Sequence, residues 1–392
     1  MIMKWMKAGL LFAAVPIFAA VPFNCEHGRS LQVAIDCAAP GETLQLSGTC
    51  SGPLLIKGKS LTLAGKPGAV VDGSGQDAIT VIGPAHVTLS NLTVQNGQNG
   101  INASGGAELS ILNTKVQKNK VMGILLSGAS SAALSGAATD LNGVNGIDAE
   151  GSSASRVNGS YESSSNGVFG VNINGSSSFT LSGAQVSVSQ NTLGIQIGTS
   201  ASAFISDAAT TVNVSRNVTT GLTIVSGAHM VDFGGAINTT GNGVHGVSVD
   251  SKAGLDLDAA ATLTSSGIAQ DGVHLEETSV LTMFNTTAFS GAPGTTTINS
   301  QNNLGNGISI LTGSNLTVIH QAALNSTGNA GDGIQVDNGS GLTLIQSNVT
   351  SNSNKDIVLT FGSRADVSGT TFGILSCDAT VLVRGGELTC PK

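Results

Sequence analysis

The chain has 392 residues, of which few are aromatic and few are charged. Tryptophan and tyrosine occur once each, at Trp5 and Tyr161, and Asp, Glu, Lys and Arg together make up 10% of the sequence. The 16 Lys and Arg are scattered and the net charge is −8, whereas binding to nucleic acid requires a basic stripe. The composition therefore excludes nucleic acid as a partner. It leaves Tyr161 as the one tyrosine that could serve as a platform for a sugar ring.

Cysteine is missing from the long middle of the chain. The five cysteines lie near its ends, at Cys25, Cys37, Cys50, Cys377 and Cys390. Close Cys-x-x-Cys spacing is absent, so a metal site made of cysteines is not expected. An oxidising compartment favours disulfides. We expect one bridge between Cys377 and Cys390 and a second between Cys50 and either Cys25 or Cys37, which leaves one thiol free.

Long apolar runs are absent after the first 20 residues. Residues 1–20 have the pattern of a secretory signal peptide, since Lys4 and Lys7 precede an apolar run from Ala8 to Ala20. This run is too short for a comfortable membrane span, and no later segment resembles one. We therefore expect a secreted or extracytoplasmic protein, extracellular or periplasmic, without a membrane span in its mature chain.

Glycine, in contrast, is abundant, with 53 residues, and ten of the glycines form a ladder. They are spaced 23 to 27 residues apart with one step of 35, and each precedes a triplet whose first and third residues are apolar. The ladder glycines are Gly100, Gly123, Gly146, Gly170, Gly194, Gly221, Gly246, Gly272, Gly307 and Gly333. A second apolar column, such as Leu109-Ser110-Ile111, and a third, which includes Val94, Leu141 and Phe289, follow in the repeat. This period-two alternation predicts three short, half-buried strands per repeat.

Three short strands per repeat, with no helical pattern between them, predict a parallel coil. Equivalent strands of successive repeats would pair, giving an all-β, single-stranded, right-handed parallel β-helix with three sheets. Counting from the Leu54–Ile56 turn to the Ile374–Leu375 turn gives about fourteen rungs. Asn or Asp often precedes the ladder glycine, and we interpret this column as a turn position that tolerates positive φ. The long step between Phe289 and Gly307 predicts a surface loop over 292–299.

Both open ends of such a coil need a cover. Residues 30–39 carry Leu31, Ala34 and Ile35 on one helical face, and they predict a short amphipathic helix that caps the N-terminal end. We divide the chain into a signal peptide (1–20), an N-terminal cap that includes this helix (21–53), the β-helix (54–376) and a C-terminal cap (377–392).

These features resemble the pectate-lyase-like right-handed parallel β-helix superfamily. The resemblance rests on the glycine-led triplets, on the helix ahead of Gly41-Glu42-Thr43-Leu44-Gln45-Leu46 and on Lys59-Ser60-Leu61-Thr62-Leu63, and it covers residues 30–383. The superfamily includes polysaccharide lyases, hydrolases, epimerases, phage tailspikes and adhesins, so the resemblance implies a fold but no single activity. It implies an extracellular polysaccharide or a cell surface as the partner, and no oligomeric state follows from it.

Enzymes of this superfamily carry acid and base groups on the outer face of one sheet, which here is the middle position of the triplets. No two adjacent rungs have carboxylates at that position, whereas glycoside hydrolysis uses a pair of them. A lyase needs a base, commonly Lys or Arg, and a cation that neutralises the uronate, yet Lys252 is the only lysine or arginine between Arg216 and Lys355. The sequence thus predicts no cofactor and no metal site, although Ca²⁺ would be the cofactor of a lyase.

The densest group of ionisable residues lies between His245 and Glu277. Within it, His245 and Asp271 stand before the ladder glycines of successive rungs, and His274 and Glu276 follow; these four are the candidate catalytic residues. Asn, Asp and His also occur at turns for backbone reasons alone, which is the alternative interpretation.

Two functions remain open at this point. The missing catalytic motifs favour a secreted, non-catalytic rod with a cell-surface, adhesive or glycan-contacting role. The alternative is a polysaccharide lyase, or another carbohydrate-active enzyme, that acts on an acidic polysaccharide through the group around His274.

Overall fold

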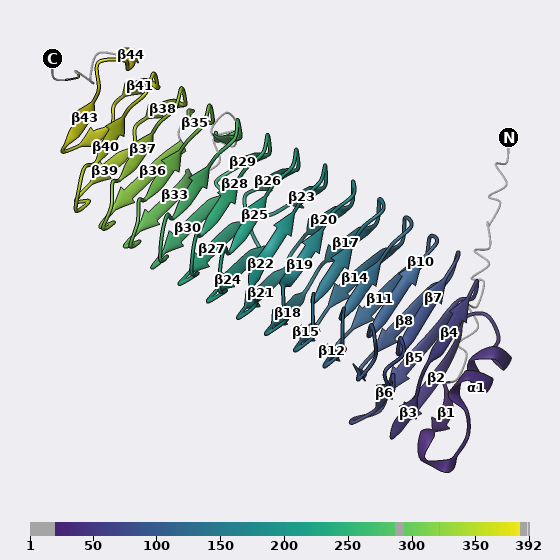
Figure 1. Ribbon diagram of the computed structural model, residues 1–392. Coiled ribbons are helices and arrows are strands. Elements are labelled where there is room, and N and C mark those ends of the chain that lie inside the picture. The colour runs from purple at the N-terminus through teal and green to yellow at the C-terminus, as the bar shows by residue number, and fades with distance from the viewer. Residues whose placement is uncertain (1–19, 287–293, 321, 385–389, 391–392) are drawn as a thin grey trace, which may run out of the picture.

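The computed structural model describes residues 20–286, 294–320, 322–384 and 390. Within these residues the chain winds into a rod of short strands, with the first and the last strands at opposite ends (Figure 1). Every strand pair is parallel, and equivalent strands of successive turns lie side by side in three sheets. The predicted all-β parallel solenoid of about fourteen turns is therefore confirmed. Among the described residues α1 (Leu31–Cys37) is the single α-helix, and none of their helices has the length and apolar character of a membrane span.

We name the three sheets A, B and C. Each turn contributes one strand to each sheet, in the order C, A, B. Sheet A contains β1 (Val21–Asn24), β2 (Glu42–Ser47), β5 (Leu61–Gly65), β8 (His86–Ser90), β11 (Glu108–Leu112), β14 (Ser131–Ser135), β17 (Ala154–Val157), β20 (Ser178–Leu181), β23 (Ser202–Ile205), β26 (His229–Phe233), β29 (Gly254–Asp258), β32 (Val280–Met283), β35 (Asn315–Val318), β38 (Gly341–Ile345), β41 (Arg364–Ser368) and β44 (Leu382–Arg384). Sheet B contains β3 (Thr49–Ser51), β6 (Val70–Asp72), β9 (Thr93–Gln95), β12 (Lys115–Gln117), β15 (Ala137–Asp140), β18 (Ser160–Ser164), β21 (Gln185–Ser189), β24 (Thr211–Ser215), β27 (Ala236–Thr240), β30 (Thr262–Ser266), β33 (Thr296–Gln301), β36 (Ala322–Thr327), β39 (Asn348–Thr350) and β42 (Thr371–Phe372). Sheet C contains β4 (Leu54–Lys57), β7 (Ile79–Ile82), β10 (Ile101–Ser104), β13 (Ile124–Leu126), β16 (Ile147–Ala149), β19 (Phe169–Ile173), β22 (Leu193–Ile197), β25 (Leu222–Ile224), β28 (Val247–Val249), β31 (Val273–Leu275), β34 (Ile308–Ile310), β37 (Ile334–Val336), β40 (Ile357–Leu359) and β43 (Leu375–Cys377).

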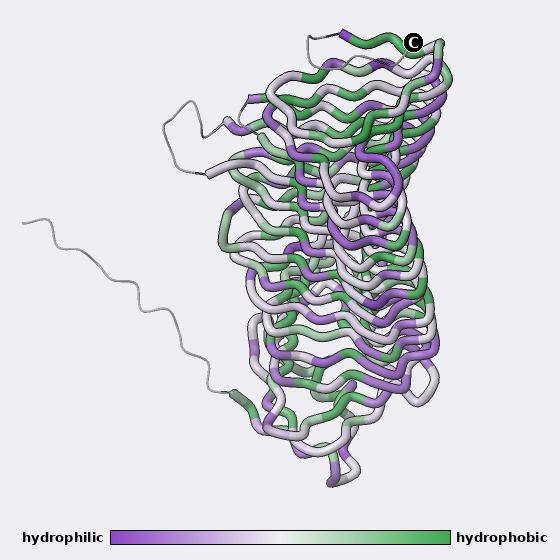
Figure 2. The backbone as a smooth tube through the Cα atoms, turned by 90° about the vertical axis from the view of Figure 1, so that its left-hand side faces the viewer, coloured by the Kyte–Doolittle hydropathy of each residue, from purple (hydrophilic) through white to green (hydrophobic). Residues whose placement is uncertain are grey.

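The apolar positions of the repeat form the core of the rod. In sheet C the first and third residues of each triplet are buried, and Ile147, Val171 and Ile195 lie in register over one another. Figure 2 shows hydrophobic residues recurring at the same place in successive turns of the tube. Because each buried side chain is covered by its equivalents in the turns above and below, the core is one continuous spine.

A buried asparagine ladder lies at the corner between sheets B and C. Along the ladder, a side-chain oxygen accepts N–H groups of the asparagine one turn earlier: Asn191 Oδ1 accepts from Asn166 N at 2.9 Å and from Asn166 Nδ2 at 3.0 Å. The ladder consists of Asn119, Asn142, Asn166, Asn191, Asn217, Asn242, Asn303, Asn329 and Asn352. Ile268 interrupts it between Asn242 and Asn303. These side chains satisfy backbone donors that the sharp corner would otherwise leave unpaired.

The ladder glycines are required by close packing between turns, and none of the ten has a positive φ. A Cβ atom on Gly170 would lie only 2.8 Å from the carbonyl oxygen of Gly194 in the next turn. The Asn and Asp residues before these glycines have no positive φ either. Instead, their side chains accept a backbone N–H of the next turn, as Asn145 Oδ1 does from Phe169 N at 3.2 Å. Our interpretation of this column as a positive-φ position was therefore wrong.

Three details of the predicted repeat need correction. Leu141 is 51% exposed at a corner with positive φ, and the buried Thr139 takes its expected place in sheet B. Phe289 lies outside the described residues, and Ile298 occupies the third column in that turn. The loop predicted over 292–299 was wrong in its second half, because β33 begins at Thr296.

Helix α1 lies against the N-terminal end of the coil, where Leu31 and Ile35 are buried. Gln32 pairs with the backbone of Leu55 in β4: its Nε2 donates to Leu55 O at 2.9 Å, and Leu55 N donates to its Oε1 at 2.7 Å. Lys59 Nζ donates to the last carbonyl groups of the helix, including that of Ile35 at 2.8 Å. The helix end and the edge of the first strand of sheet C are thereby both hydrogen-bonded.

Two disulfides lie at opposite ends of the rod. Cys377 is bonded to Cys390, as predicted, and Cys50 is bonded to Cys25. Of the two partners predicted for Cys50, Cys37 was the wrong one: it is free and exposed at the end of α1, whereas Cys25 packs beside β3, which contains Cys50. The predicted signal peptide, apart from residue 20, lies outside the described residues.

Candidate functional site

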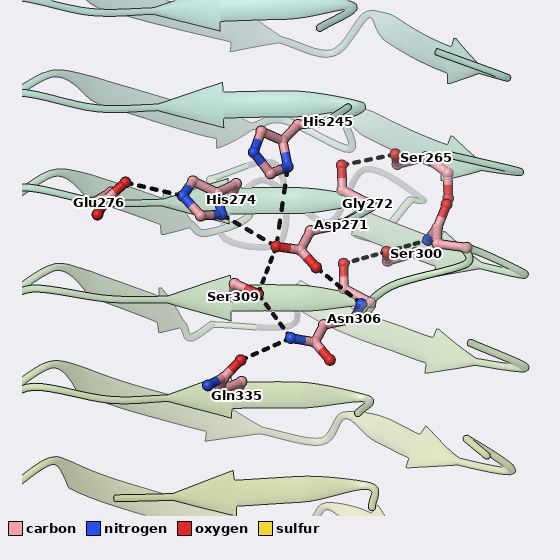
Figure 3. A network of polar contacts seen from close by, with 12 residues as sticks. His245, Ser265, Asp271, Gly272, His274, Glu276, Ser300, Asn306, Ser309 and Gln335 are labelled. Atoms are coloured by element: carbon pink, nitrogen blue, oxygen red, sulfur yellow. Dashed lines mark hydrogen bonds and ion pairs between the residues drawn. The ribbon is translucent and has the colours of Figure 1, made fainter. Parts of the chain in front are cut away.

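The four candidate residues come from two successive turns of the coil. His245 precedes β28, and Asp271 holds the same position before β31, so that Gly246 N donates to Asp271 O at 3.1 Å. His274 is the outward-facing middle residue of β31, and Glu276 follows the end of this strand. Figure 3 shows the side chains gathered on the outer side of sheet C. The structure therefore brings together the four residues that the sequence analysis proposed.

Asp271 is the centre of this cluster. Its Oδ2 lies 3.2 Å from His274 Nδ1 and 4.0 Å from His245 Nδ1, and it accepts a hydrogen bond from Ser309 Oγ at 2.9 Å. Its Oδ1 accepts the backbone N–H of Asn306 at 2.9 Å. One carboxylate oxygen thus takes part in the turn ladder of the alternative interpretation, and the other faces the histidines.

The two histidine rings stack, with centroids 4.2 Å apart and an angle of 18° between their planes. Burial lowers the pKa of His245 to about 4, and the positive charge of the neighbouring His274 adds to this effect. His245 is therefore neutral at neutral pH. Its Nδ1 atom is buried and has no hydrogen-bond partner among the described residues.

His274 and Asp271 stabilise each other's charge. Burial acts to lower the pKa of His274, but the hydrogen bonds to Asp271 and Glu276, at 3.2 and 3.3 Å, outweigh it and raise this pKa. Burial also acts to raise the pKa of Asp271, but hydrogen bonds from His274, the Asn306 amide and Ser309 lower it overall. The cluster therefore places the His274 ring between two carboxylates, with the ring of His245 stacked on it.

The other ionisable residues of the predicted patch lie apart from this cluster. Asp256 pairs with His229 on sheet A, with 3.1 Å between Oδ2 and Nε2. Glu277 accepts a hydrogen bond from Ser251 Oγ at 2.8 Å. Among the described residues, no lysine or arginine forms an ion pair with the acids of the cluster. The strands separate these side chains because alternate residues point to opposite faces and the chain turns a corner after each strand.

Tyr161 does not lie on the surface. It is 1% exposed, and its hydroxyl oxygen is 2.6 Å from Thr139 Oγ1 inside the core. Its suggested role as a sugar platform was therefore wrong.

Three further polar residues extend the cluster along sheet C and were not predicted. Asn306 Nδ2 donates to Ser309 Oγ at 3.1 Å and to Gln335 Oε1 at 2.8 Å. A signal for them was present in the sequence, because the glycine ladder places Asn306 in the column of Asp271, and Ser309 and Gln335 in the column of His274.

The cluster also holds a set of possible metal ligands. His245, Asp271 and His274 each offer one ligand atom, and these atoms lie within 4.8 Å of one another. Within the described part of the chain, no other group of three or more His, Cys, Asp or Glu side chains comes so close together. The arrangement can therefore act chemically as an acid–base pair or as a cation site.

A scan against protein-family models finds no match, and a search of curated proteins finds no relative. Among solved structures, the chain is similar to the A-module of the mannuronan C-5 epimerase AlgE6 of Azotobacter vinelandii, with a TM-score of 0.50, 14% identity, and coverage of 93% of this chain and 100% of that one. The chain therefore shares the parallel β-helix fold of that module. The periplasmic alginate epimerase AlgG (TM-score 0.40, 13% identity, 74% of this chain and 80% of that one) and pectate lyase Pel9A (0.39, 14%, 80% and 73%) are also among the similar structures. At these identities the likeness concerns the β-helix fold alone.

Proposed function

We propose that this protein is a non-catalytic rod that works outside the cytoplasm and contacts glycans, either at a cell surface or in an extracellular polysaccharide. The observation that carries the proposal is the hydrogen bonding of the outward-facing side chains of sheet C. Seven of them are hydrogen-bonded to polar side chains of the same or the adjacent turn and are therefore already engaged: Asn102, Asp148, Asn172, Gln196, His274, Ser309 and Gln335.

These hydrogen bonds connect residues of two or three successive turns. Asn102 Nδ2 donates to Asp77 Oδ2 at 2.8 Å at the N-terminal part of the sheet. In the middle, Asn172 Nδ2 donates to Asp148 Oδ1 at 3.1 Å and Gln196 Nε2 donates to Asn172 Oδ1 at 3.0 Å. Such amides and carboxylates present a fixed pattern of donors and acceptors, which suits the hydroxyl groups of sugars.

The chemistry of the cluster also supports a non-catalytic role. Abstraction of the proton at C5 of a uronate needs a base and a positive charge that neutralises the carboxylate. The cluster contains no lysine or arginine, and the one histidine whose pKa is raised, His274, is already hydrogen-bonded to Asp271 and Glu276. The one tyrosine that could act as an acid is in the core.

Two observations support a location outside the cytoplasm. The chain has two disulfides, which persist in oxidising compartments. Its first residues also have the pattern of a signal peptide.

The test compares turnover with binding on one panel of glycans. The purified chain is incubated with alginate, polygalacturonate and neutral polysaccharides, with and without Ca²⁺. Unsaturated products are followed by ultraviolet absorbance, and exchange at C5 is followed by deuterium incorporation from solvent. We expect no turnover on any substrate, together with retardation of the protein in affinity electrophoresis on at least one glycan. Turnover that is lost in His274→Ala would overturn the proposal, and so would the absence of any binding.

One observation favours the alternative, an enzyme acting on an acidic polysaccharide. The cluster places two histidines whose pKa values are shifted in opposite directions beside each other, with 4.2 Å between the ring centroids, and such a pair could supply an acid and a base. In that case His245→Ala and His274→Ala would each abolish turnover, and the exposed His86→Ala would leave it unchanged.

A further inference from the structure

We propose that His245, Asp271 and His274 form a binding site for a divalent transition-metal ion, of which Zn²⁺ fits the ligands best. The proposal does not depend on the proposed function, because a non-catalytic rod and an enzyme could both hold such an ion.

The ligand set has the right chemistry and nearly the right dimensions. Imidazole nitrogen and carboxylate oxygen are the usual ligands of Zn²⁺, and metal–ligand bonds of about 2.0–2.1 Å place tetrahedral ligand atoms roughly 3.4 Å apart. Asp271 Oδ2 lies 3.2 Å from His274 Nδ1 and 4.0 Å from His245 Nδ1. Because the two imidazole rings stack with 18° between their planes, their nitrogen lone pairs lie in nearly parallel planes, so three protein bonds require one ring to turn about its side-chain torsions as well as a contraction of less than about an ångström.

The surroundings of the ligands match those of known metal sites. A metal-binding histidine usually donates its second ring N–H to a carboxylate, which fixes the ring and directs the other nitrogen at the metal. Here His274 Nε2 lies 3.3 Å from Glu276 Oε2, so His274 Nδ1 is the nitrogen that faces the cluster. Asp271 is held in turn by Ser309 Oγ and by the Asn306 amide, both at 2.9 Å. Two of the three ligands, His274 and Asp271, are thus held in place from outside.

His245 gives an independent indication. Its Nδ1 atom is buried and has no hydrogen-bond partner among the described residues, although it faces the Asp271 carboxylate. A buried polar atom without a partner is costly, and a bound ion would give this nitrogen a partner. The other exposed His–acid pairs of the rod, His86 with Glu108 and His229 with Asp256, offer only one histidine each.

The same features argue against Ca²⁺ at this position. Calcium takes six to eight oxygen ligands, whereas the cluster offers two ring nitrogens and a single fully facing carboxylate. The three side chains remain 13–15% exposed, so a water molecule or a ligand oxygen can reach the fourth coordination position from solvent. An oxygen-bearing anion, such as a carboxylate, is the class of ligand that this open position would take.

The test uses the untagged chain, freed of metal with a chelator and titrated with Zn²⁺ by calorimetry and with Co²⁺ by visible absorption. We expect one ion per chain and, for Co²⁺, the spectrum of a tetrahedral site with nitrogen ligands. Separate His245→Ala and His274→Ala variants should each weaken binding at least about 100-fold, and Glu276→Gln should weaken it about 10- to 100-fold. The double variant His86→Ala/His229→Ala removes the same kind of side chain elsewhere on the rod and should bind like the wild type.

Circular dichroism would show whether a variant has failed to fold. In that case a second measurement, on the histidine rings themselves, tests the site. In the wild-type chain, Zn²⁺ should shift the imidazole ¹⁵N signals of two histidines only. The shifted signal of His245 should be missing from the spectrum of His245→Ala, and that of His274 from the spectrum of His274→Ala. Absence of saturable binding by the wild type would overturn the proposal. Binding that survives both single substitutions, or shifts confined to other histidines, would overturn it as well.

Discussion

At the scale of single residues, the least expected side chain of the rod is Asp232, which points into the apolar core. It is completely buried in β26, in register between Ile205 and Leu257 of the neighbouring turns. Its Oδ1 accepts the Gly235 N–H at 2.7 Å, and its Oδ2 has no partner among the described residues. Burial raises the pKa of Asp232 to about 7, although the Gly235 hydrogen bond acts in the opposite direction.

This raised pKa predicts a specific dependence of stability on pH. Between the ordinary value of 3.8 and about 7, the folded state keeps a proton on Asp232 that the unfolded state loses. The free energy of unfolding should therefore fall as pH rises through this window, by roughly 4 kcal/mol at most. Asp232→Asn, which keeps an oxygen for Gly235, should remove this part of the slope in urea titrations at pH 4, 5, 6 and 7. Asp366→Asn, at an exposed position of the same sheet, is the control; equal slopes for wild type and Asp232→Asn would contradict the prediction.

The asparagine ladder leads to a second prediction about single residues. Asn191 is fully buried; its Oδ1 accepts two hydrogen bonds from Asn166, and its own donors reach Ser163 O and Asn217 Oδ1. Asn191→Ala leaves several buried groups unpaired and should lower the free energy of unfolding by about 3 kcal/mol. The control is Asn213→Ala, which removes one exposed hydrogen bond and should cost at most about 0.5 kcal/mol. Equal losses for the two variants, measured by urea unfolding, would rule out a special role of the ladder.

The sequence was sufficient to predict which residues form the candidate site, but it did not predict the contacts between them. The column of His245 and Asp271 follows directly from the glycine spacing, but the Nδ1–Oδ2 distance of 4.0 Å exceeds a hydrogen bond. The stacking of His274 on His245 joins a corner to the middle of a strand, and no repeat spacing encodes that approach. Asn191 and its equivalents recur with the period of the repeat, but a polar residue at a corner looks like ordinary turn chemistry until its burial is known.

At the scale of elements, alternation of apolar residues was sufficient to predict the strands of all three sheets. Errors arose where side-chain type and backbone geometry disagree, as at Leu141, an apolar residue at a corner with a φ of 56°. They also arose where the repeat lengthens. There a run of threonines was read as a loop, although Thr is a good strand residue and β33 begins at Thr296.

The contact between α1 and β4 allows a prediction about the N-terminal end. Gln32 supplies the edge of β4 with a donor and an acceptor, as a neighbouring strand would. Gln32→Leu should therefore speed hydrogen exchange of the Leu55 amide several-fold and promote concentration-dependent association, because it opens a strand edge to other chains. Gln185→Leu removes a similar side-chain bond, to Ala209 O, in the middle of the rod, where sheet B has no free edge, and should do neither. Hydrogen-exchange mass spectrometry measures the first effect and light scattering the second. Unchanged exchange of the Leu55 amide in Gln32→Leu would contradict the prediction.

At the scale of the whole molecule, each turn contacts mainly its two neighbours. Stability should therefore be a sum of contributions from turns and from their interfaces, with the weakest turns at the ends. The last turn is the thinnest part of the core, since Leu375, Cys377 and Val383 are only partly buried. The Cys377–Cys390 bridge, with a sequence separation of 13, closes this turn.

Removal of that bridge should loosen one end of the rod and leave the other unchanged. A closed loop of this size contributes about 3 kcal/mol, and because coupling passes only between adjacent turns, the loss should stay near β42, β43 and β44. In Cys377→Ser/Cys390→Ser we expect faster amide exchange in these strands and unchanged exchange in β1 to β8. Cys25→Ser/Cys50→Ser is the reciprocal control and should affect the N-terminal strands alone. Should either double variant instead speed exchange uniformly along the rod, the chain would be unfolding as one cooperative unit, and the description of the molecule as a stack of locally coupled turns would have to be abandoned.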